Sequence, residues 1–191
     1  MKINLKPRTM MYPAPAVVAS ADDEDGNPDC CTLAFATMCS HHPPAVMIAI
    51  NSTLKRKTLA DILKSNELCI GYPSCEHMDE TDYFGIESGY NQNKLEKVNF
   101  SYRDAEMVNA PIIEEFKVSV ECRVINIAEV GSHTQVTGEI VNIQADESVV
   151  DGNGKIIFEK LDSLAYDDVT HSYFRMGDKI SDAFKPGRKF M

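Results

Sequence analysis

Apolar and polar residues alternate along much of the chain with the period of two that is typical of β-strands. The longest such stretch covers residues 116–130, in which Val118, Val120 and Cys122 share one face. A second stretch covers residues 134–146, and only a Gly-Ser-His turn lies near the boundary between the two. We therefore expect these stretches to form an antiparallel pair of strands.

Shorter apolar runs predict further strands at residues 14–20, 31–38, 45–51 and 67–73. An Asp-Gly-Asn-Pro cluster separates the first two runs and is a strong turn signal. A tandem proline pair ends the second run, because prolines cannot donate hydrogen bonds to a ladder. A hairpin-type turn and one more short strand are expected within residues 150–167.

Helical spacing is confined to the middle of the chain. Residues 57–66 place apolar side chains as an amphipathic helix does, with Thr58 as the expected N-cap and Asp61 three residues later. The acid-rich stretch 74–100 predicts either two short helices or one helix and a loop. No Gly-x-Gly-x-x-Gly segment is present, so a dinucleotide-binding Rossmann unit is not expected.

Together these elements predict one mainly β domain over residues 1–191. Short strands with antiparallel connections favour a closed or nearly closed, Greek-key-like antiparallel barrel, with a few short helices as lids. The tail, about residues 171–191, is expected to be an extended segment with a small helix. Such a tail suits a lid or a contact with a second subunit.

Charge and hydropathy exclude two classes of partner. The formal net charge is -10 and the pI is about 4.9. This composition argues against nucleic-acid binding, because a phosphate backbone demands a broad cationic face. No apolar stretch approaches the ~20 residues needed to span a bilayer, and the N-terminus lacks the apolar core of a signal peptide. We expect a cytoplasmic protein that does not associate with membranes.

The six cysteines show neither a Cys-x-x-Cys pair nor a histidine at zinc-ligand spacing, so no metal site is expected. Free thiols are the expected state in a reducing cytoplasm. Cys69 and Cys122 fall in strand-like runs, where cysteine acts as a small core residue. For Cys39 two interpretations stay open, a structural residue or a redox-active thiol.

One loop of this acidic chain concentrates positive charge. Three consecutive cations stand among polar side chains there: Asn51, Ser52, Thr53, Lys55, Arg56, Lys57 and Thr58. A helix N-terminus offers free N–H groups and partial positive charge, so the loop suits a phosphate group. Arg56 is the favoured contact because guanidinium binds phosphate in a bidentate way, with Lys55 next and Lys57 pointing to solvent. Three solvated cations before a capped helix are the alternative.

Nine segments together carry a specific family pattern in their order and spacing. They are YPAPAVV, GNPDCCTLAFATMCSHHPPAVMIAIN, ADILKSNELCIGYPS, ETDYFGIESG, NKLEK, NAPIIEEF, GSH, GEIV and YFRMG. The chain resembles the flavin reductase-like family, which binds FMN in a split β-barrel, and the likeness is strongest to its flavoredoxin branch. One departure is Phe35, where the family often has tryptophan.

The resemblance implies a homodimer that holds FMN at the barrel near the subunit interface. The strand that includes Ala34 and Ala36 would lie along the flavin ring, with its backbone amides on the polar edge of the ring. The loop of residues 51–58 would take the phosphate. The cofactor-binding residues expected on this basis are Thr32, Leu33, Ala34, Cys39, Ser40, Asn51, Ser52, Lys55, Arg56 and Thr58.

Two main functions are compatible with this resemblance. The first is an FMN-dependent oxidoreductase that passes electrons from NADH or NADPH through FMN to a flavin or protein acceptor. The second is a flavoredoxin-type electron carrier reduced by a redox protein partner, without NAD(P)H activity. An FMN-binding protein without turnover is a third possibility. His133 matches a family element near the flavin face and is the candidate catalytic residue, with a hydrogen-bonded turn histidine as the alternative.

Overall fold

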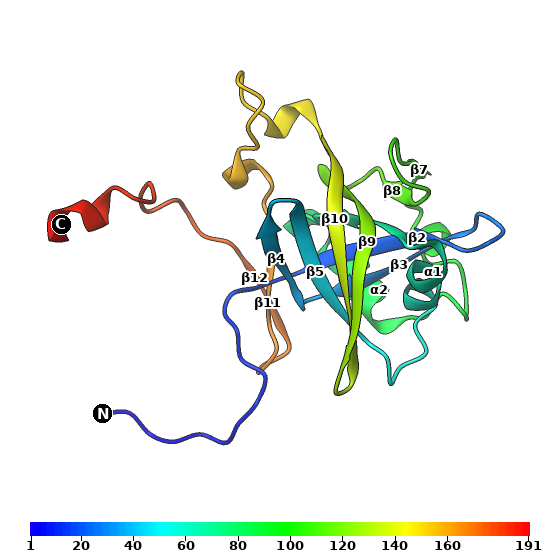
Figure 1. The fold of residues 1–191 in the computed structure, drawn as a ribbon, viewed down its shortest axis with the longest axis horizontal. Coiled ribbons are helices and arrows are strands. Elements are labelled where there is room, and N and C mark those ends of the chain that lie inside the picture. The colour runs from blue at the N-terminus through cyan, green and yellow to red at the C-terminus, as the bar shows by residue number, and fades with distance from the viewer.

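The computed structural model describes all 191 residues, and a seven-stranded sheet forms its centre (Figure 1). The order across the sheet is β3-β2-β6-β9-β10-β5-β4, and every neighbouring pair is antiparallel. The strands are β2 (Val17–Asp22), β3 (Pro28–Leu33), β4 (Ala36–His41), β5 (Pro44–Asn51), β6 (Glu67–Gly71), β9 (Val118–Val130) and β10 (His133–Ala145). The prediction of a mainly β, antiparallel fold is confirmed.

The two outermost strands of this sheet follow each other in the chain. β3 ends at Leu33 and β4 begins at Ala36, so Ala34 and Phe35 cross from one edge of the sheet to the other. The backbone N–H of Ala49 donates to the Phe35 carbonyl at 2.8 Å and attaches this link to β5. The sheet is therefore curled into a split barrel whose edge strands are not paired. The single strand predicted for residues 31–38 is wrong, because the chain changes edges in its middle.

The β9–β10 ribbon is the longest element and forms the antiparallel pair that the alternation predicts. Gly138 on β10 is required by close packing, since a Cβ there would lie 2.8 Å from the Cys122 Cβ. The interior is filled by small and branched side chains that bury apolar surface between the curled strands. Members of this cluster include Val17, Ala19, Cys31, Ile48, Ile50, Leu68, Ile70, Val120, Cys122 and Val136.

Helices cover the barrel beside β2 and β3. α1 (Lys57–Ser65) contributes Leu59 and Ile62 to the interior cluster. The acid-rich stretch forms η1 (Cys75–His77), α2 (Met78–Ile86) and α3 (Lys94–Lys97), which confirms the option of two short helices. A two-stranded sheet follows, made of β7 (Tyr102–Asp104) and β8 (Pro111–Ile113). A second apolar cluster lies under these elements and contains Val18, Cys30, Phe84, Leu95, Ile113 and Phe116.

The start of α1 differs from its prediction. Arg56, in extended conformation, occupies the N-cap position without a side-chain cap. Thr58 lies inside the first turn and is fully buried, so the N-cap prediction for Thr58 is wrong. Its hydroxyl donates a hydrogen bond to the buried carboxylate of Asp29 on β3, and this long-range contact decides its position.

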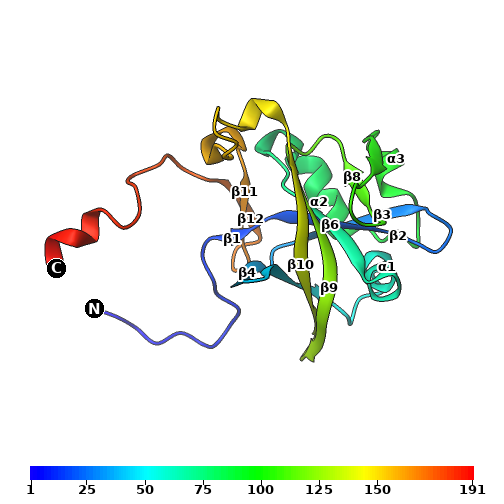
Figure 2. The same ribbon diagram turned by 45° about the horizontal axis from the view of Figure 1, so that its top comes forward.

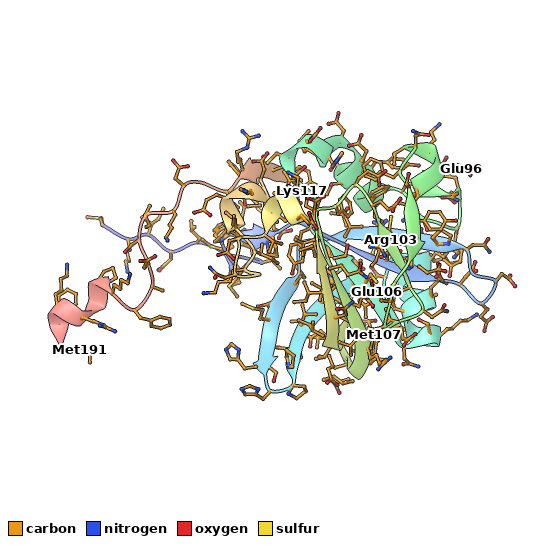
Figure 3. All side chains as sticks on the ribbon, turned by 90° about the horizontal axis from the view of Figure 1, so that it is seen from above. Glu96, Arg103, Glu106, Met107, Lys117 and Met191 are labelled. Carbon is orange, nitrogen blue, oxygen red and sulfur yellow. The ribbon has the colours of Figure 1, made fainter.

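The ends of the chain form a small sheet and two arms. β1 (Ala14–Pro15), β11 (Leu164–Asp167) and β12 (Ser172–Arg175) make a three-stranded sheet. Two short 3-10 helices, η2 (Glu147–Val149) and η3 (Phe158–Lys160), lie between β10 and β11 in the chain. Beyond the small sheet, residues 1–12 (the N-terminal arm) and residues 176–191 (the C-terminal arm, with η4, Pro186–Phe190) extend away from the body on the same side (Figures 1 and 2). Figure 3 shows Met191 at the far end of the second arm. No helix is long and apolar enough to cross a membrane.

Candidate functional site

The end of β3 is the centre of the candidate site. Thr32, Leu33 and Ala34 line two neighbouring cavities, one toward His133 and one toward the β11–β12 hairpin. We name these the histidine cavity and the hairpin cavity. Because both cavities share these three residues, the two spaces adjoin at the end of β3.

The histidine cavity has a volume of about 180 Å³ and gathers several of the predicted site residues. It is lined by Cys31, Thr32, Leu33, Ala34, Phe35, Ala49, Ile50, Asn51, Arg56, His133 and Asp168. The register of β5 and β10 places His133 directly opposite Asn51. The structure therefore brings six predicted residues together, from segments up to about a hundred positions apart in the sequence: Thr32, Leu33, Ala34, Asn51, Arg56 and His133.

His133 is held by two neighbours at the mouth of this cavity. Its imidazole stacks on the Phe35 ring, with 5.1 Å between the ring centres and 26° between their planes. Its Nδ1 lies 2.9 Å from the Ser132 hydroxyl. These contacts fix the orientation of the imidazole, and Phe35 provides a flat aromatic surface beside it.

Arg56 joins the basic loop to the end of α2. Its guanidinium donates to the carbonyls of Gly85 at 2.6 Å, Glu87 at 2.9 Å and Ile86 at 3.5 Å. Carbonyls at a helix C-terminus carry partial negative charge, so a cation there is favourable. Arg56 thus fastens the loop to α2 while it also lines the histidine cavity.

The other two cations of the loop have different surroundings. Lys57 bonds to Asp61 at 2.9 Å and Asp23 at 3.1 Å, so the expectation that it points to solvent is wrong. Although burial opposes it, hydrogen bonding to these carboxylates raises the pKa of Lys57. Lys55 is exposed, and its ammonium makes no hydrogen bond or ion pair within the chain. Lys55 is therefore the cation of this loop that remains available to an anion.

A groove next to the loop extends the site outward. It is lined by Ser52, Leu54, Lys55, Arg56, Leu59, Ala60, Leu63, Ser88, Tyr90 and Asn91, and we name it the basic groove. The Ser88 hydroxyl donates to the Lys55 carbonyl at 2.9 Å, and the Ser52 hydroxyl donates to the Ser132 carbonyl at 3.3 Å. Arg56 lines both the basic groove and the histidine cavity, so the two spaces meet at its side chain.

Behind the loop lies a buried charged network. Thr58 donates to Asp29 at 2.6 Å, and the Lys94 ammonium lies 3.2 Å from the other oxygen of Asp29. Lys94 also donates to the carbonyls of Cys30 and, at 3.4 Å, Glu87. The side chains of Lys94 and Asp29 are only 1% and 3% exposed. Since buried charges need partners, this network ties β3, α1 and α3 together beneath the basic loop.

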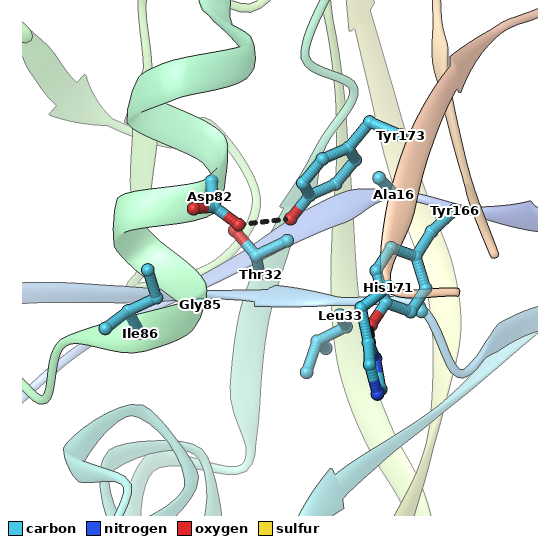
Figure 4. A pocket seen from close by; sticks show the side chains of 10 residues that line it. Ala16, Thr32, Leu33, Asp82, Gly85, Ile86, Tyr166, His171 and Tyr173 are labelled. Atoms are coloured by element: carbon cyan, nitrogen blue, oxygen red, sulfur yellow. Dashed lines mark hydrogen bonds between the residues drawn. The ribbon is translucent and has the colours of Figure 1, made fainter. Parts of the chain in front are cut away.

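The hairpin cavity, shown in Figure 4, has a volume of about 330 Å³. Tyr166, His171 and Tyr173 reach into it from β11, β12 and their turn, and Asp82 faces them from α2. Tyr173 donates to Asp82 at 3.1 Å, and the Tyr166 hydroxyl lies 2.8 Å from Nδ1 of His171. The sequence pattern did not single out these residues, because nothing local shows that the hairpin folds back over β3.

Three predicted residues lie outside these spaces, and the first of them, Thr58, is fully buried behind the basic loop, where it bonds to Asp29. Cys39 and Ser40 are exposed on β4 and line neither cavity nor the basic groove. All six cysteines are unpaired. Burial raises the pKa of the Cys31 thiol at the histidine cavity, so this sulfur stays protonated and weakly nucleophilic. No cluster of three or more His, Cys, Asp or Glu side chains is arranged to hold a metal ion.

The whole arrangement suits a long ligand with one anionic end. Cations and hydroxyls gather at the basic loop, whereas small and aromatic residues gather at the end of β3. FMN has the same two kinds of end, an anionic phosphate on a ribityl chain and a flat aromatic ring. The residues present therefore fit a flavin nucleotide such as FMN.

Comparison with known proteins agrees with this geometry. Residues 9–168 match the model of the family described as flavin reductase like domain. The chain belongs to this flavin reductase-like family. The prediction from the sequence is thereby confirmed at the level of the family.

Two solved structures share the fold over almost their whole length. The flavoredoxin of Desulfovibrio vulgaris (Miyazaki F) is 30% identical, with a TM-score of 0.92, over 98% of this chain and 100% of that one. The flavoredoxin of Methanosarcina acetivorans is 26% identical, also with a TM-score of 0.92, over 100% of both chains. Among curated proteins, the reductase component of 4-hydroxyphenylacetate 3-monooxygenase from Pseudomonas aeruginosa is 24% identical over 68% of this chain and 74% of its own.

Proposed function

We propose that this protein binds FMN and passes electrons from NADH or NADPH through it to a flavin or protein acceptor. The observation that carries the proposal is the convergence of Thr32–Ala34, Asn51, Arg56 and His133 on one cavity beside a basic loop. The likeness to a monooxygenase reductase component supports the reductase activity. When bound, FMN supplies the hydride-accepting chemistry.

The residues of the chain would bind and orient. Lys55 neutralises the phosphate, and Arg56 holds the loop against α2 and offers its remaining N–H groups. Ala34 leaves room for a flat ring to approach the backbone. His133, fixed by Phe35 and Ser132, presents an imidazole at the mouth of the cavity, where it steadies charge on the ring or on an incoming donor. No side chain needs to act as a nucleophile.

An electron carrier of the flavoredoxin type is the second candidate. The likeness to two flavoredoxins over nearly the whole chain favours it. The acidic composition also favours it, because a net charge of -10 steers a basic protein partner toward the molecule. In this function the same cavity binds FMN, and a redox protein replaces NAD(P)H as the donor.

We also propose a homodimer in the cytoplasm. Large apolar side chains on both arms are exposed and cover nothing within the chain, among them Ile3, Leu5, Met11, Ile180, Phe184 and Phe190. Exposed apolar side chains gathered on an arm are typical of a segment that packs on another subunit. The six unpaired cysteines suit a reducing compartment.

The phosphate site is tested by comparing the affinities for FMN and riboflavin. We expect Lys55→Ala to weaken FMN binding about tenfold or more, since a charge-assisted hydrogen bond contributes about 1.5–3 kcal/mol. Riboflavin, which lacks the phosphate, should change by less than about twofold. Quenching of flavin fluorescence measures both affinities. Lys97→Ala, an exposed lysine on α3, is the matched control. Equal losses for both ligands would place the phosphate elsewhere.

The electron donor is tested by stopped-flow absorbance of the FMN-loaded protein. Rapid bleaching of the flavin band on mixing with NADH or NADPH is expected for the reductase. Bleaching only with a reduced ferredoxin-type protein would favour the carrier instead. Failure of the purified protein to bind FMN at micromolar concentration would overturn both.

A further inference from the structure

The turn between β11 and β12, residues 168–171, borders both cavities that adjoin at the end of β3. Asp168 lines the histidine cavity, and His171 lines the hairpin cavity. Residues 169–171 are exposed, so the turn buries little apolar surface against the barrel. Its position beside the histidine cavity therefore depends on the polar contacts that fix it.

One fixed point of the hairpin is on α2. Tyr173 on β12 donates to Asp82 at 3.1 Å. The Tyr166 hydroxyl lies 2.8 Å from Nδ1 of His171, which links the end of the turn to β11. Neither bond involves Asp168, so the part of the turn that faces the histidine cavity needs another attachment.

The N-terminal arm supplies that attachment with two side chains. The Thr9 hydroxyl donates to Oδ2 of Asp168, and the Tyr12 hydroxyl donates to Oδ1 of Asp167. These partners lie 159 and 155 positions apart in the sequence. Figure 1 shows the arm passing beside the β11–β12 hairpin. The arm thus ties down the side of the turn that borders the histidine cavity.

The chemistry of both bonds suits a strap that can open. Hydrogen bonds from Thr170 and Tyr12 lower the pKa of Asp167 to about 2, so this carboxylate stays charged and accepts strongly at neutral pH. Met10 and Met11, between the two donors, are 67% and 82% exposed, so apolar burial adds little to the attachment. Solvent-accessible hydrogen bonds are readily exchanged for bonds to water. The strap can therefore release while the barrel stays folded.

We propose that Thr9 and Tyr12 are positioning residues that strap the β11–β12 turn over the histidine cavity and thereby set how fast a flavin nucleotide enters and leaves. The inference rests on the proposed function, because it takes this cavity as part of the flavin site. With the strap closed, Asp168 lines the cavity together with Arg56 and His133. Release of both bonds frees the turn and opens the cavity from that side. A closed strap makes the nucleotide a slowly exchanging, resident cofactor.

The test measures the rates of FMN association and release with the full chain by stopped-flow flavin fluorescence. Thr9→Val and Tyr12→Phe each remove one hydroxyl and nearly preserve the side-chain volume, and the double variant removes both. We expect the double variant to speed association and release alike, about fivefold to tenfold, the size expected for two exposed hydrogen bonds. The equilibrium affinity should change by less than about threefold, because the same opening step precedes entry and exit. Thr9→Ser, which keeps the hydroxyl, should retain the wild-type rates.

Two controls separate the strap from other roles of these segments. Tyr102→Phe removes the hydroxyl of an exposed tyrosine on β7 that lines neither cavity nor the basic groove. Deletion of residues 2–8 removes the exposed Ile3 and Leu5 but keeps both donors of the strap. Both controls should leave the two rates unchanged. If the deletion speeds release as much as the double variant does, the arm acts through its outer apolar part and the proposal is overturned.

The remaining outcomes distinguish the strap from the flavin site itself. Unchanged rates in the double variant would overturn the strap and leave the proposed function intact. Faster release with unchanged association would also overturn it, since the two hydroxyls would then stabilise the bound nucleotide without controlling its entry. Absence of FMN binding by the wild-type protein would instead end the proposed function, and the strap with it.

Discussion

Each of the three consecutive cations at positions 55–57 has different surroundings in the folded chain. Arg56 is bonded to the end of α2, Lys57 to Asp23 and Asp61, and Lys55 to nothing in the chain. The sequence predicts the basic loop itself, because three adjacent cations stand out in an acidic chain. It cannot rank them, since the partners of Arg56 lie about thirty positions further on and become neighbours only in the folded barrel.

Asp22, at the end of β2, makes stability depend on pH. Burial, followed by the nearby charges of Asp104 and Asp23, raises its pKa to about 6. An unfolded aspartate titrates near pH 4, so between about pH 4 and 6 the folded chain binds more protons than the unfolded chain. Stability from this group therefore falls as the pH rises through that window. We expect Asp22→Asn to be more stable than wild type by about 1 kcal/mol at pH 7.5, discounted for partial exposure, and equal at pH 4.

Urea unfolding of both proteins at pH 4 and pH 7.5 measures this difference. Asp25→Asn, an exposed position three residues along the chain, is the control and should show no such pH-dependent gain. A gain for Asp22→Asn that is the same at both pH values would refute the assignment, because neutralising the carboxyl cannot help where it is already protonated.

At the scale of elements, period-two alternation predicts the β9–β10 ribbon well because the strands are long and connected by a short turn. The break between β3 and β4 is different. Small and apolar residues continue through Ala34 and Phe35 without interruption, and only the curling of the sheet requires the crossing. The hairpin cavity escaped prediction for the same reason, since His171 reaches the end of β3 only through tertiary folding.

The buried network beneath the basic loop yields a test of how these elements are held. Lys94→Met keeps the length of the side chain but leaves Asp29 buried without its cation. Breaking a buried pair in this way costs about 3–5 kcal/mol. We expect urea unfolding to show a loss of this size, and the double variant with Asp29→Asn to recover part of it. Lys97→Met, exposed on the same helix, should change stability by less than about 0.5 kcal/mol. A loss below about 1 kcal/mol for Lys94→Met would mean that the pair is not essential.

At the scale of the whole molecule, charge is divided unevenly between body and arms. The N-terminal arm has three basic residues and no acidic one, and the C-terminal arm has four basic and two acidic residues. The two arms together therefore carry a net charge of +5. Because the whole chain has a net charge of -10, residues 13–175 carry -15. Opposite charges on arm and body, together with exposed apolar side chains on the arms, favour docking of each arm on a second copy of the chain.

Removal of the C-terminal arm tests this arrangement. We expect the full chain to sediment at twice its mass of 21.3 kDa at micromolar concentration, and residues 1–175 to shift toward the monomer. Lys185→Glu with Arg188→Glu should weaken the dimer most at low salt, because screening at 0.15 M already reduces attraction beyond about 8 Å. Lys97→Glu, which alters the same kind of charge on the body, controls for net charge alone. If the shortened chain and the full chain sediment alike, the arm does not hold the subunits together. If the charge variants weaken the dimer as much as the truncation does, electrostatic attraction outweighs the apolar contacts of Phe184 and Phe190. If only the truncation weakens the dimer, those two rings make the contact that holds it together.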